Sequence, residues 1–283
     1  MIGTSKQLKD KIKNISGGDG KKASSLIRNF MMERFLERVS CSKYRNHFIL
    51  KGGMLVASIV GVNMRATMDI DTTVKALPLN ETDAQRIIEE ICNIRLEDNV
   101  EFHITSVKTI MEDFDYPGIR IMLEARLDRM RQPIKIDIST DDVITPKAVE
   151  YDYKLMFEER TISVLTYNVE TLLSEKMQTI LSRGIANTRL RDFYDVYWII
   201  NLYREQIDTD MLYKAFCATC EQRSTIFPSN EIENILQLLV NDLHMEEMWI
   251  RFKENNFYVG ELDWADVKIY VTDAIRFFLL KEC

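Results

Sequence analysis

Apolar and polar positions repeat with two different periods along this chain. In the first part, short stretches alternate with a period of two residues, which is typical of half-buried β-strands. We expect strands at 47–50, 68–74, 100–110, 119–127, 134–139 and 161–165. Apolar residues at helical spacing predict helices at 22–40, 54–60 and 81–94, the last of them capped by Asn80.

From about residue 165 onward the pattern changes to helical spacing alone. We expect helices there at 169–182, 190–203, 210–220, 231–252 and 264–280. The sequence therefore predicts an α+β fold, with an α/β domain over residues 1–165 and an all-helical domain over 166–283. A Lys-rich segment at 6–22 is either a solvated terminus or a stretch that follows a phosphate backbone.

The composition indicates a globular protein, since 46% of the 283 residues are hydrophobic and 29% are charged. A net charge of −7 argues against a uniformly basic protein that coats DNA, but it leaves a local nucleic-acid patch open. No apolar run reaches the ~20 residues that cross a bilayer, and the first residues lack the apolar stretch of a secretory signal. We therefore expect no membrane association, a cytoplasmic location and free thiols on the five Cys.

Three short motifs of the first half carry candidate chemistry. A glycine pair at 52–53 lies between an expected strand and an expected helix, where the backbone can approach a phosphate and free helix N–H groups attract anions. Asp69 and Asp71 are two residues apart on an expected strand, so their side chains point to the same face. Asp137 stands in an otherwise apolar strand, where a carboxylate is costly unless something compensates it.

Together, these motifs predict a nucleotidyltransferase. Convergent carboxylates favour Mg²⁺, and two such ions can assist the in-line displacement of pyrophosphate from an NTP. No GxxxxGK[ST] motif is present, so a P-loop NTPase is not indicated. Each motif alone has a simpler interpretation as a turn, a solvated strand end or a device against edge aggregation. Their order along the chain is what favours the metal site.

A second charged cluster lies in the helical half, at residues 170–195. Lys176 and Arg183 are seven residues apart on an expected helix and therefore share a face. Such a basic face is suited to a triphosphate. Spacing alone slightly favours a solvated, salt-bridged pair of helices.

Four segments follow one another in a recognisable order: KGGMLVASIVGVNMRATMDID (51–71), KIDI (135–138), VETLLSEKMQTILSR (169–183) and RDFYD (191–195). In these segments the sequence resembles the AbiEii/AbiGii family of nucleotidyltransferase-like toxins from abortive-infection toxin–antitoxin systems. The resemblance implies a DNA polymerase β-like nucleotidyltransferase core followed by a helical C-terminal domain. It also implies metal-dependent transfer of a nucleotide from an NTP, in some members to the 3′ end of tRNA.

The resemblance also assigns roles to individual residues. It implies metal ligands at Asp69, Asp71 and Asp137, phosphate-binding residues at Lys51, Gly52, Gly53 and Lys176, and a catalytic set of Asp69, Asp71, Lys176 and Asp192. Asp192 either orients the lysine or positions the acceptor. Arg65 and Thr67 fit the family's R-x-T-x-D-x-D pattern, whereas the glycine pair differs from the more common Gly-Ser.

We therefore expect a toxin that transfers NMP to RNA, with the tRNA 3′ end as acceptor, and thereby blocks growth and phage propagation. The identity of the NTP and the oligomeric state stay open. The expected partner is a winged-helix antitoxin, which need not bind the toxin directly. Two alternatives remain: nucleotidylation of a protein or small molecule, and a non-catalytic regulator that binds GTP or another NTP.

Overall fold

The structure is a computed structural model that describes residues 2–61, 63–77, 80–110, 118–140 and 142–280. By their packing, the residues form two compact units. The first unit comprises Met1–Asp142 and Val149–Thr166, and the second comprises Val143–Ala148 and Tyr167–Cys283. The short segment Val143–Ala148, which the sequence pattern groups with the first half, packs with the second unit.

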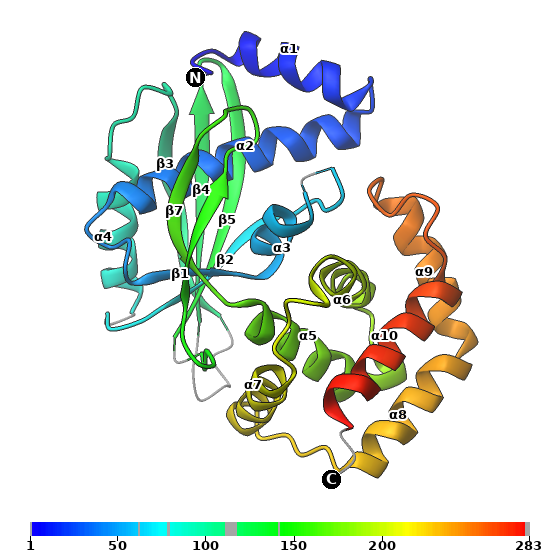
Figure 1. Cartoon of the computed structure of the whole chain (residues 1–283). Coiled ribbons are helices and arrows are strands. Elements are labelled where there is room, and N and C mark those ends of the chain that lie inside the picture. Colours follow the sequence, from blue (N-terminus) through cyan, green and yellow to red (C-terminus); the bar gives the residue numbers. More distant parts are fainter. Residues whose placement is uncertain (1, 62, 78–79, 111–117, 141, 281–283) are drawn as a thin grey trace. The chain divides into compact units, whose positions relative to one another are not determined.

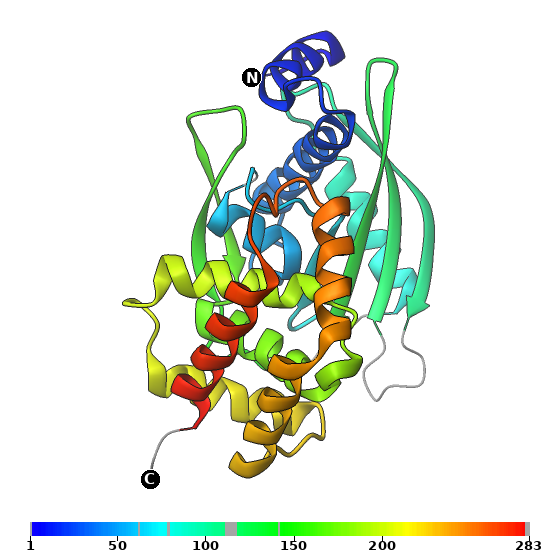
Figure 2. The same cartoon turned by 90° about the vertical axis from the view of Figure 1, so that its right-hand side faces the viewer.

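A mixed sheet forms the centre of the first unit (Figure 1), and its strands lie in the order β3-β4-β5-β2-β1-β7-β6. The strands are β1 (Phe48–Lys51), β2 (Asp69–Val74), β3 (Glu101–Ile110), β4 (Gly118–Leu127), β5 (Met130–Thr140), β6 (Val149–Lys154) and β7 (Thr161–Thr166). Strand β1 is antiparallel to β2 and parallel to β7, while β2 is parallel to β5. The long β4–β5 hairpin and the β6–β7 hairpin therefore flank the central β2–β1 pair (Figure 2).

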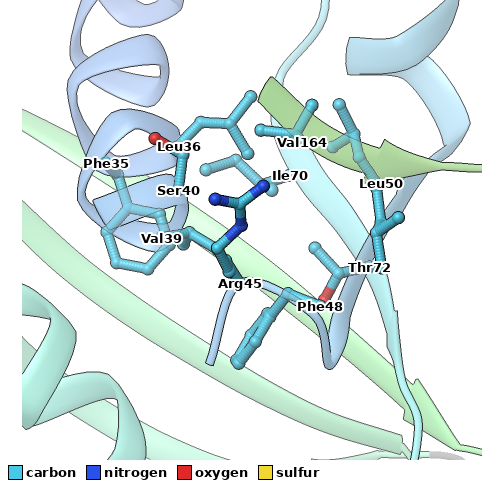
Figure 3. A pocket seen from close by; sticks show the side chains of 11 residues that line it. Phe35, Leu36, Val39, Ser40, Arg45, Phe48, Leu50, Ile70, Thr72 and Val164 are labelled. Atoms are coloured by element: carbon cyan, nitrogen blue, oxygen red, sulfur yellow. The ribbon is translucent and has the colours of Figure 1, made fainter. Parts of the chain in front are cut away.

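The helices of the first unit are α1 (Ser5–Ser16), α2 (Gly20–Cys41), α3 (Gly52–Val60) and α4 (Glu81–Cys92). Helices α2 and α4 contact each other and cover one face of the sheet. On that face Leu50 and Ile70 meet Phe35 of α2 around a small apolar cavity (Figure 3). Because side chains alternate along a strand, Asp69 and Asp71 point to the opposite face.

The Lys-rich segment is not a frayed terminus, because its first four lysines lie on helix α1, and Lys21 and Lys22 lie in the first turn of α2. The Thr4 hydroxyl caps the helix by accepting from the Gln7 N–H, and Gly17 ends it in the left-handed conformation at φ +59°. Leu8 and Ile12, one turn apart, are fully buried, and the helix packs on α2. The apolar stripe thus fixes the helix, and its lysines stand on the outer side.

The second unit is helical and is built from α5 (Val169–Arg183), α6 (Leu190–Tyr203), α7 (Thr209–Gln222), α8 (Ser229–Asn241), α9 (Leu243–Asn255) and α10 (Trp264–Leu279). Aromatic side chains of α6, α9 and α10 form part of its core. The Trp264 ring lies 5.2 Å from that of Phe193 and 5.5 Å from that of Trp249 between centroids. Within the described residues, no helix is both long and apolar enough to span a bilayer.

Two expectations about single elements were wrong. The helix expected at 231–252 is two helices, α8 and α9, visible as successive segments in Figures 1 and 2. Asp242 interrupts the helical backbone and starts α9 by accepting from the Met245 N–H. Strand β6 was not expected, because this polar edge strand pairs with β7 alone and shows little apolar alternation.

The α+β class is confirmed, with a mixed sheet, flanking helices and a helical C-terminal part. The remaining expected strands and helices are present within a few residues of their expected ends. Asn80 caps α4 as expected, by accepting from the Asp83 N–H.

Candidate active site

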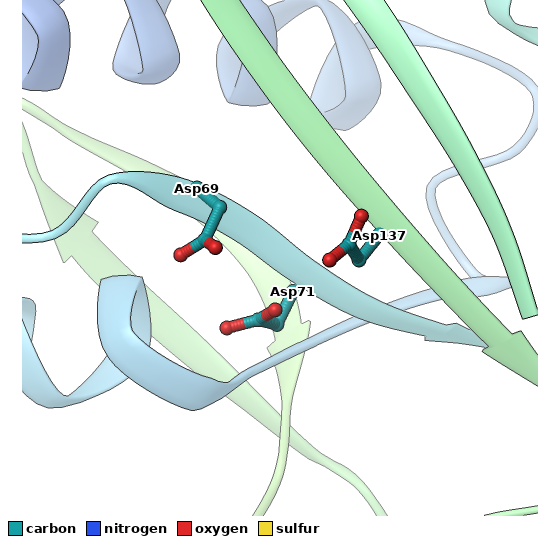
Figure 4. A group of neighbouring side chains, drawn as sticks. All are labelled: Asp69, Asp71 and Asp137. Carbon is teal, nitrogen blue, oxygen red and sulfur yellow. The ribbon is translucent and has the colours of Figure 1, made fainter. Parts of the chain in front are cut away.

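Three carboxylates converge on one face of the central sheet. Asp69 and Asp71 lie on β2, and Asp137 lies on the neighbouring strand β5 (Figure 4). Each offers one oxygen atom, and these atoms all lie within 4.8 Å of one another. Within the described residues this is the one group of three or more His, Cys, Asp or Glu side chains that fits a metal ion.

Strand register produces this convergence. Asp71 lies directly beside Asp137 in the parallel β2–β5 ladder, and Asp69 lies beside Lys135. Ile70, between the two aspartates, is completely buried under α2 and anchors β2 on its other face. A shift of the register by one residue would reverse the faces of β2, so the buried Ile70 also fixes the direction of the carboxylates.

Two basic side chains compensate the carboxylates, and we had not expected either of them. Arg120 on β4 lies opposite Asp137 and donates two hydrogen bonds to it, from Nε and Nη2, both at 2.8 Å. The Nζ of Lys135 lies 2.6 Å from Asp69 and 3.4 Å from Asp137. Lys135 is two residues from Asp137 on the same strand and therefore shares its face, which was an available signal. The partner of Arg120 depends on the β4–β5 register, which the sequence does not show.

The neighbouring charges give the carboxyl groups different pKa values. Burial raises the pKa of Asp71 to about 6, with a further increase from the charge of Asp69, against the lowering effects of Lys51 and the Gly53 N–H. Burial acts in the same direction on Asp137. There the Arg120 hydrogen bonds and the charges of Lys135 and Arg120 outweigh burial and lower the pKa.

The glycine pair forms the first turn of α3 and lies against Asp71. The Gly53 N–H points at Asp71 Oδ2 over 3.4 Å. Gly52 has φ +61°, and a Cβ there would lie 2.1 Å from the same oxygen, so both the backbone conformation and the space require glycine. Lys51 precedes the helix and pairs with Asp142.

Arg65 and Thr67 pack against Gly53, the second glycine of the turn. Both are almost completely buried. A Cβ at Gly53 would lie 2.7 Å from Thr67 Oγ1 and 3.2 Å from Arg65 Nη2. The R-x-T-x-D-x-D pattern thus joins residues that shape the turn to residues that carry the carboxylates.

Lys176 and Asp192 lie in the second unit, where they form a buried cluster. Lys176 Nζ lies 3.1 Å from Asp192 Oδ1 and 2.7 Å from Asp195 Oδ2, and all three side chains are buried. Arg189 adds an ion pair to Asp192 at 3.0 Å. Asp192 and Asp195 thus both contact the Lys176 ammonium group, and our site prediction did not include Asp195. Arg183, expected on the same face as Lys176, is exposed.

The carboxylate group fits a divalent cation such as Mg²⁺. Its donors are hard oxygens of the type that Mg²⁺ prefers. The raised pKa of buried Asp71 is the response of a carboxyl group whose negative charge lacks a sufficient counter-charge. Asp69, Asp71 and Asp137 would hold the ion.

The family of the chain follows from a comparison with family models. The model described as the nucleotidyl transferase AbiEii toxin of type IV toxin–antitoxin systems matches residues 34–270. The chain belongs to this family. The resemblance noted from the sequence is thereby confirmed, and the chain is a member of a family of nucleotidyltransferase toxins.

One solved structure supports the fold of this family member, and a second resembles it more weakly. JHP933 from Helicobacter pylori superposes with a TM-score of 0.51 at 14% identity, covering 90% of this chain and 91% of JHP933. The antibiotic-resistance factor ANT(2'')-Ia matches with a TM-score of 0.42 at 11% identity, over 71% of this chain and 95% of that one. No curated protein sequence matches the chain. At these identities the JHP933 likeness establishes the fold alone.

Replacing Gly52 by alanine should weaken divalent-cation binding roughly 10–100-fold, the usual cost of disturbing groups around a metal site. The new methyl group would displace the Asp71 carboxylate. Gly260→Ala is the matched control, because Gly260 has φ +60° and no atom within 4 Å of its Cβ position. Binding of Mn²⁺, followed by electron paramagnetic resonance, measures the difference. Equal Mn²⁺ affinities in the two variants would contradict the prediction.

Cation binding should also weaken as the pH falls through about 6, the pKa of Asp71. Below that pH the carboxyl group is protonated, and a protonated carboxyl is a poor ligand. Asp137 does not produce this change, since its pKa is lowered. We expect about a tenfold loss of Mn²⁺ affinity between about pH 7 and pH 5. An affinity that is constant over this range would show that Asp71 is not a ligand.

Lys176→Ala should destabilise the second unit by about 3–5 kcal/mol, because it leaves two buried aspartates without their shared cation. The exposed Lys214→Ala is the control and should change stability by less than about 0.5 kcal/mol. Urea unfolding followed by tryptophan fluorescence isolates this unit, since Trp198, Trp249 and Trp264 all belong to it. Identical unfolding midpoints in the two variants would refute a structural role for Lys176.

Proposed function

We propose that this chain is a divalent-cation-dependent enzyme that transfers NMP from an NTP to RNA, with the 3′ end of tRNA as acceptor. The observation that carries the proposal is the set of three carboxylates beside the glycine turn at the start of α3. Membership in a family of nucleotidyltransferase toxins supports the reaction class. The consequence for a cell is blocked growth, and we propose that this also limits phage propagation.

The glycine turn is suited to the triphosphate. Helix α3 begins at Gly52, and the side chain of its N-cap residue, Lys51, does not cap it. The positive end of the helix dipole there favours an anion, and the Gly53 N–H already points at the Asp71 carboxylate. Because neither glycine has a side chain, the backbone of the turn lies directly against Asp71 and Thr67. A phosphate bound to a cation on Asp71 would therefore lie close to this backbone. Lys51, one residue earlier, adds positive charge at the same place.

The carboxylates are suited to the transfer itself. When bound, divalent cations would supply charge neutralisation on the phosphates and activation of the acceptor hydroxyl. Asp69 and Asp71 would hold them, and Asp137, fixed in direction by Arg120, would complete the site. In the reaction, the acceptor oxygen bonds to the α-phosphorus while the bond to the leaving pyrophosphate breaks.

The second unit contributes Lys176 and Asp192 under this proposal. Their roles toward the triphosphate and the acceptor rest on the family resemblance. Within the second unit, Asp192 and Asp195 hold the Lys176 ammonium group in one position. We further propose that the protein acts in the cytoplasm and that a separate winged-helix antitoxin opposes it without needing direct contact.

A transfer assay tests the proposal. Wild-type protein is incubated with bulk tRNA, Mg²⁺ and each α-³²P-labelled NTP in turn, and label on the tRNA is measured. Asp69→Asn should lose more than about 100-fold of this activity, because even groups behind a metal ligand cost 10–100-fold. Asp152→Asn makes the same chemical change on an exposed position of the first unit and should retain activity.

The other outcomes of this assay separate the alternatives. Release of pyrophosphate without label on RNA would replace the RNA acceptor by a protein or a small molecule. Binding of NTP without release of pyrophosphate would favour a regulator that performs no transfer. Equal labelling by wild type and Asp69→Asn would remove the carboxylates from the mechanism.

A further inference from the structure

The N-terminal segment concentrates positive charge in a chain that is acidic overall. Residues 1–28 contain seven Lys and Arg but two Asp, whereas the whole chain has a net charge of −7. The match to the family model begins at residue 34, so this segment lies outside the part that defines the family. Its charge therefore needs an explanation of its own.

The structure holds these charges on a defined surface. Lys6, Lys9 and Lys13 on α1 follow one another at intervals of three and four residues, so they share one face of the helix. All three are exposed, while Leu8 and Ile12 anchor the opposite side. At 1.5 Å per residue, the lysine stripe extends over about 10 Å.

Few acidic groups neutralise this surface. In the part of the chain that the structure describes, Lys6, Lys9, Lys13 and Lys21 form no ion pair. The carboxylate of Asp19 caps α2 by accepting from the N–H groups of Lys21 and Lys22. These acceptor contacts engage its charge locally. Asp10 is the other acidic residue of the segment, and it leaves a clear excess of positive charge.

Helix α2 contacts the chain segment that leads into β2. Helix α1 packs on α2, and Arg28 of α2 contacts the sulfur of Met68. Met68 is half exposed and directly precedes Asp69. Figure 1 shows the beginning of α2 beside the segment that leads into β2. Arg28 thus lies next to the chain segment that carries the first metal ligand.

We propose that the outer face of α1 and the beginning of α2 bind the phosphate backbone of the RNA acceptor. We call this surface, formed by Lys6, Lys9, Lys13, Lys21 and Arg28, the basic surface. Lysines on a rigid helix neutralise phosphates without reading bases, and binding gains from the counterions that are released. The proposal rests on the proposed function, because it assigns RNA as the polyanion that occupies the surface.

An RNA-binding measurement tests the basic surface independently of catalysis. The full chain is titrated into fluorescently labelled bulk tRNA in the presence of a chelator and without NTP. In Lys6→Gln/Lys9→Gln/Lys13→Gln, glutamine keeps the helix propensity and removes the charges. We expect at least about tenfold weaker binding, and a plot of log affinity against log salt that is less steep by about 2.

Two further variants keep the test decisive. Lys75→Gln/Lys154→Gln/Lys214→Gln removes the same charge from exposed positions elsewhere and should bind within about twofold of wild type. Lys6→Arg/Lys9→Arg/Lys13→Arg keeps the charge and should retain binding. Equal weakening of tRNA binding in the two glutamine variants would overturn the proposal. Wild-type protein that binds an acidic protein but no RNA would also overturn it.

The outcomes for the basic surface and for the proposed function remain distinguishable. If wild type binds tRNA through the lysines but transfers no label, the proposed function fails and the basic surface stands. If wild type transfers label and the α1 variant has an unchanged KM for tRNA, the basic surface fails and the proposed function stands. Under the proposal, the α1 variant raises the KM for tRNA and leaves kcat and the KM for NTP unchanged.

Discussion

The close approach of three carboxylates is the constraint on which the first unit depends. Asp69, Asp71 and Asp137 bring oxygens within 4.8 Å of one another, where like charges repel by on the order of 4 kcal/mol per pair near a protein surface. Isolated carboxylates would move apart. Here the β2–β5 ladder fixes their backbone, and burial of Ile70 on the other face of β2 fixes their direction. The sheet thus maintains an arrangement that the charges themselves oppose.

The protein supplies more counter-charge to Asp137 than to Asp71, and this difference affects where a cation would bind. Arg120 donates a hydrogen bond to each oxygen of Asp137. The lowered pKa keeps this carboxylate ionised, and the two bonds fix its direction before any ligand binds. Asp71 is more deeply buried and has a raised pKa, so it gains most from an arriving cation. The Gly53 N–H stabilises the ionised form of Asp71 from 3.4 Å, but a helix N-terminus is a weaker partner for a carboxylate than a guanidinium group. A cation would therefore gain most from binding at Asp71, the carboxylate whose charge the protein neutralises least.

Sequence alone predicted those parts of the site that depend on local periodicity. The alternation of Asp69, Ile70 and Asp71 gave the shared face, and the glycine pair gave the start of α3. The pairing of Asp71 with Asp137 depends on strand order across a distance of 66 residues, so its register was visible only in the structure. The counter-charge from Arg120 was missed for the same reason. A basic residue in an apolar strand has many potential partners until the register is known.

The lysines of the chain show why charge and spacing alone do not assign a role. The charged neighbours of Lys176 along its helix are typical of a surface helix, yet Lys176 is buried between two aspartates. Its removal would leave two buried carboxylates without their shared counter-charge. The lysines of α1 resembled a solvated terminus, yet the buried stripe of Leu8 and Ile12 turns them into a fixed array. The two aspartates hold the Lys176 ammonium group in one position, whereas the exposed lysines on the rigid helix α1 carry no such constraint. Burial therefore distinguishes the two kinds of lysine, and it depends on tertiary packing that periodicity shows only in part.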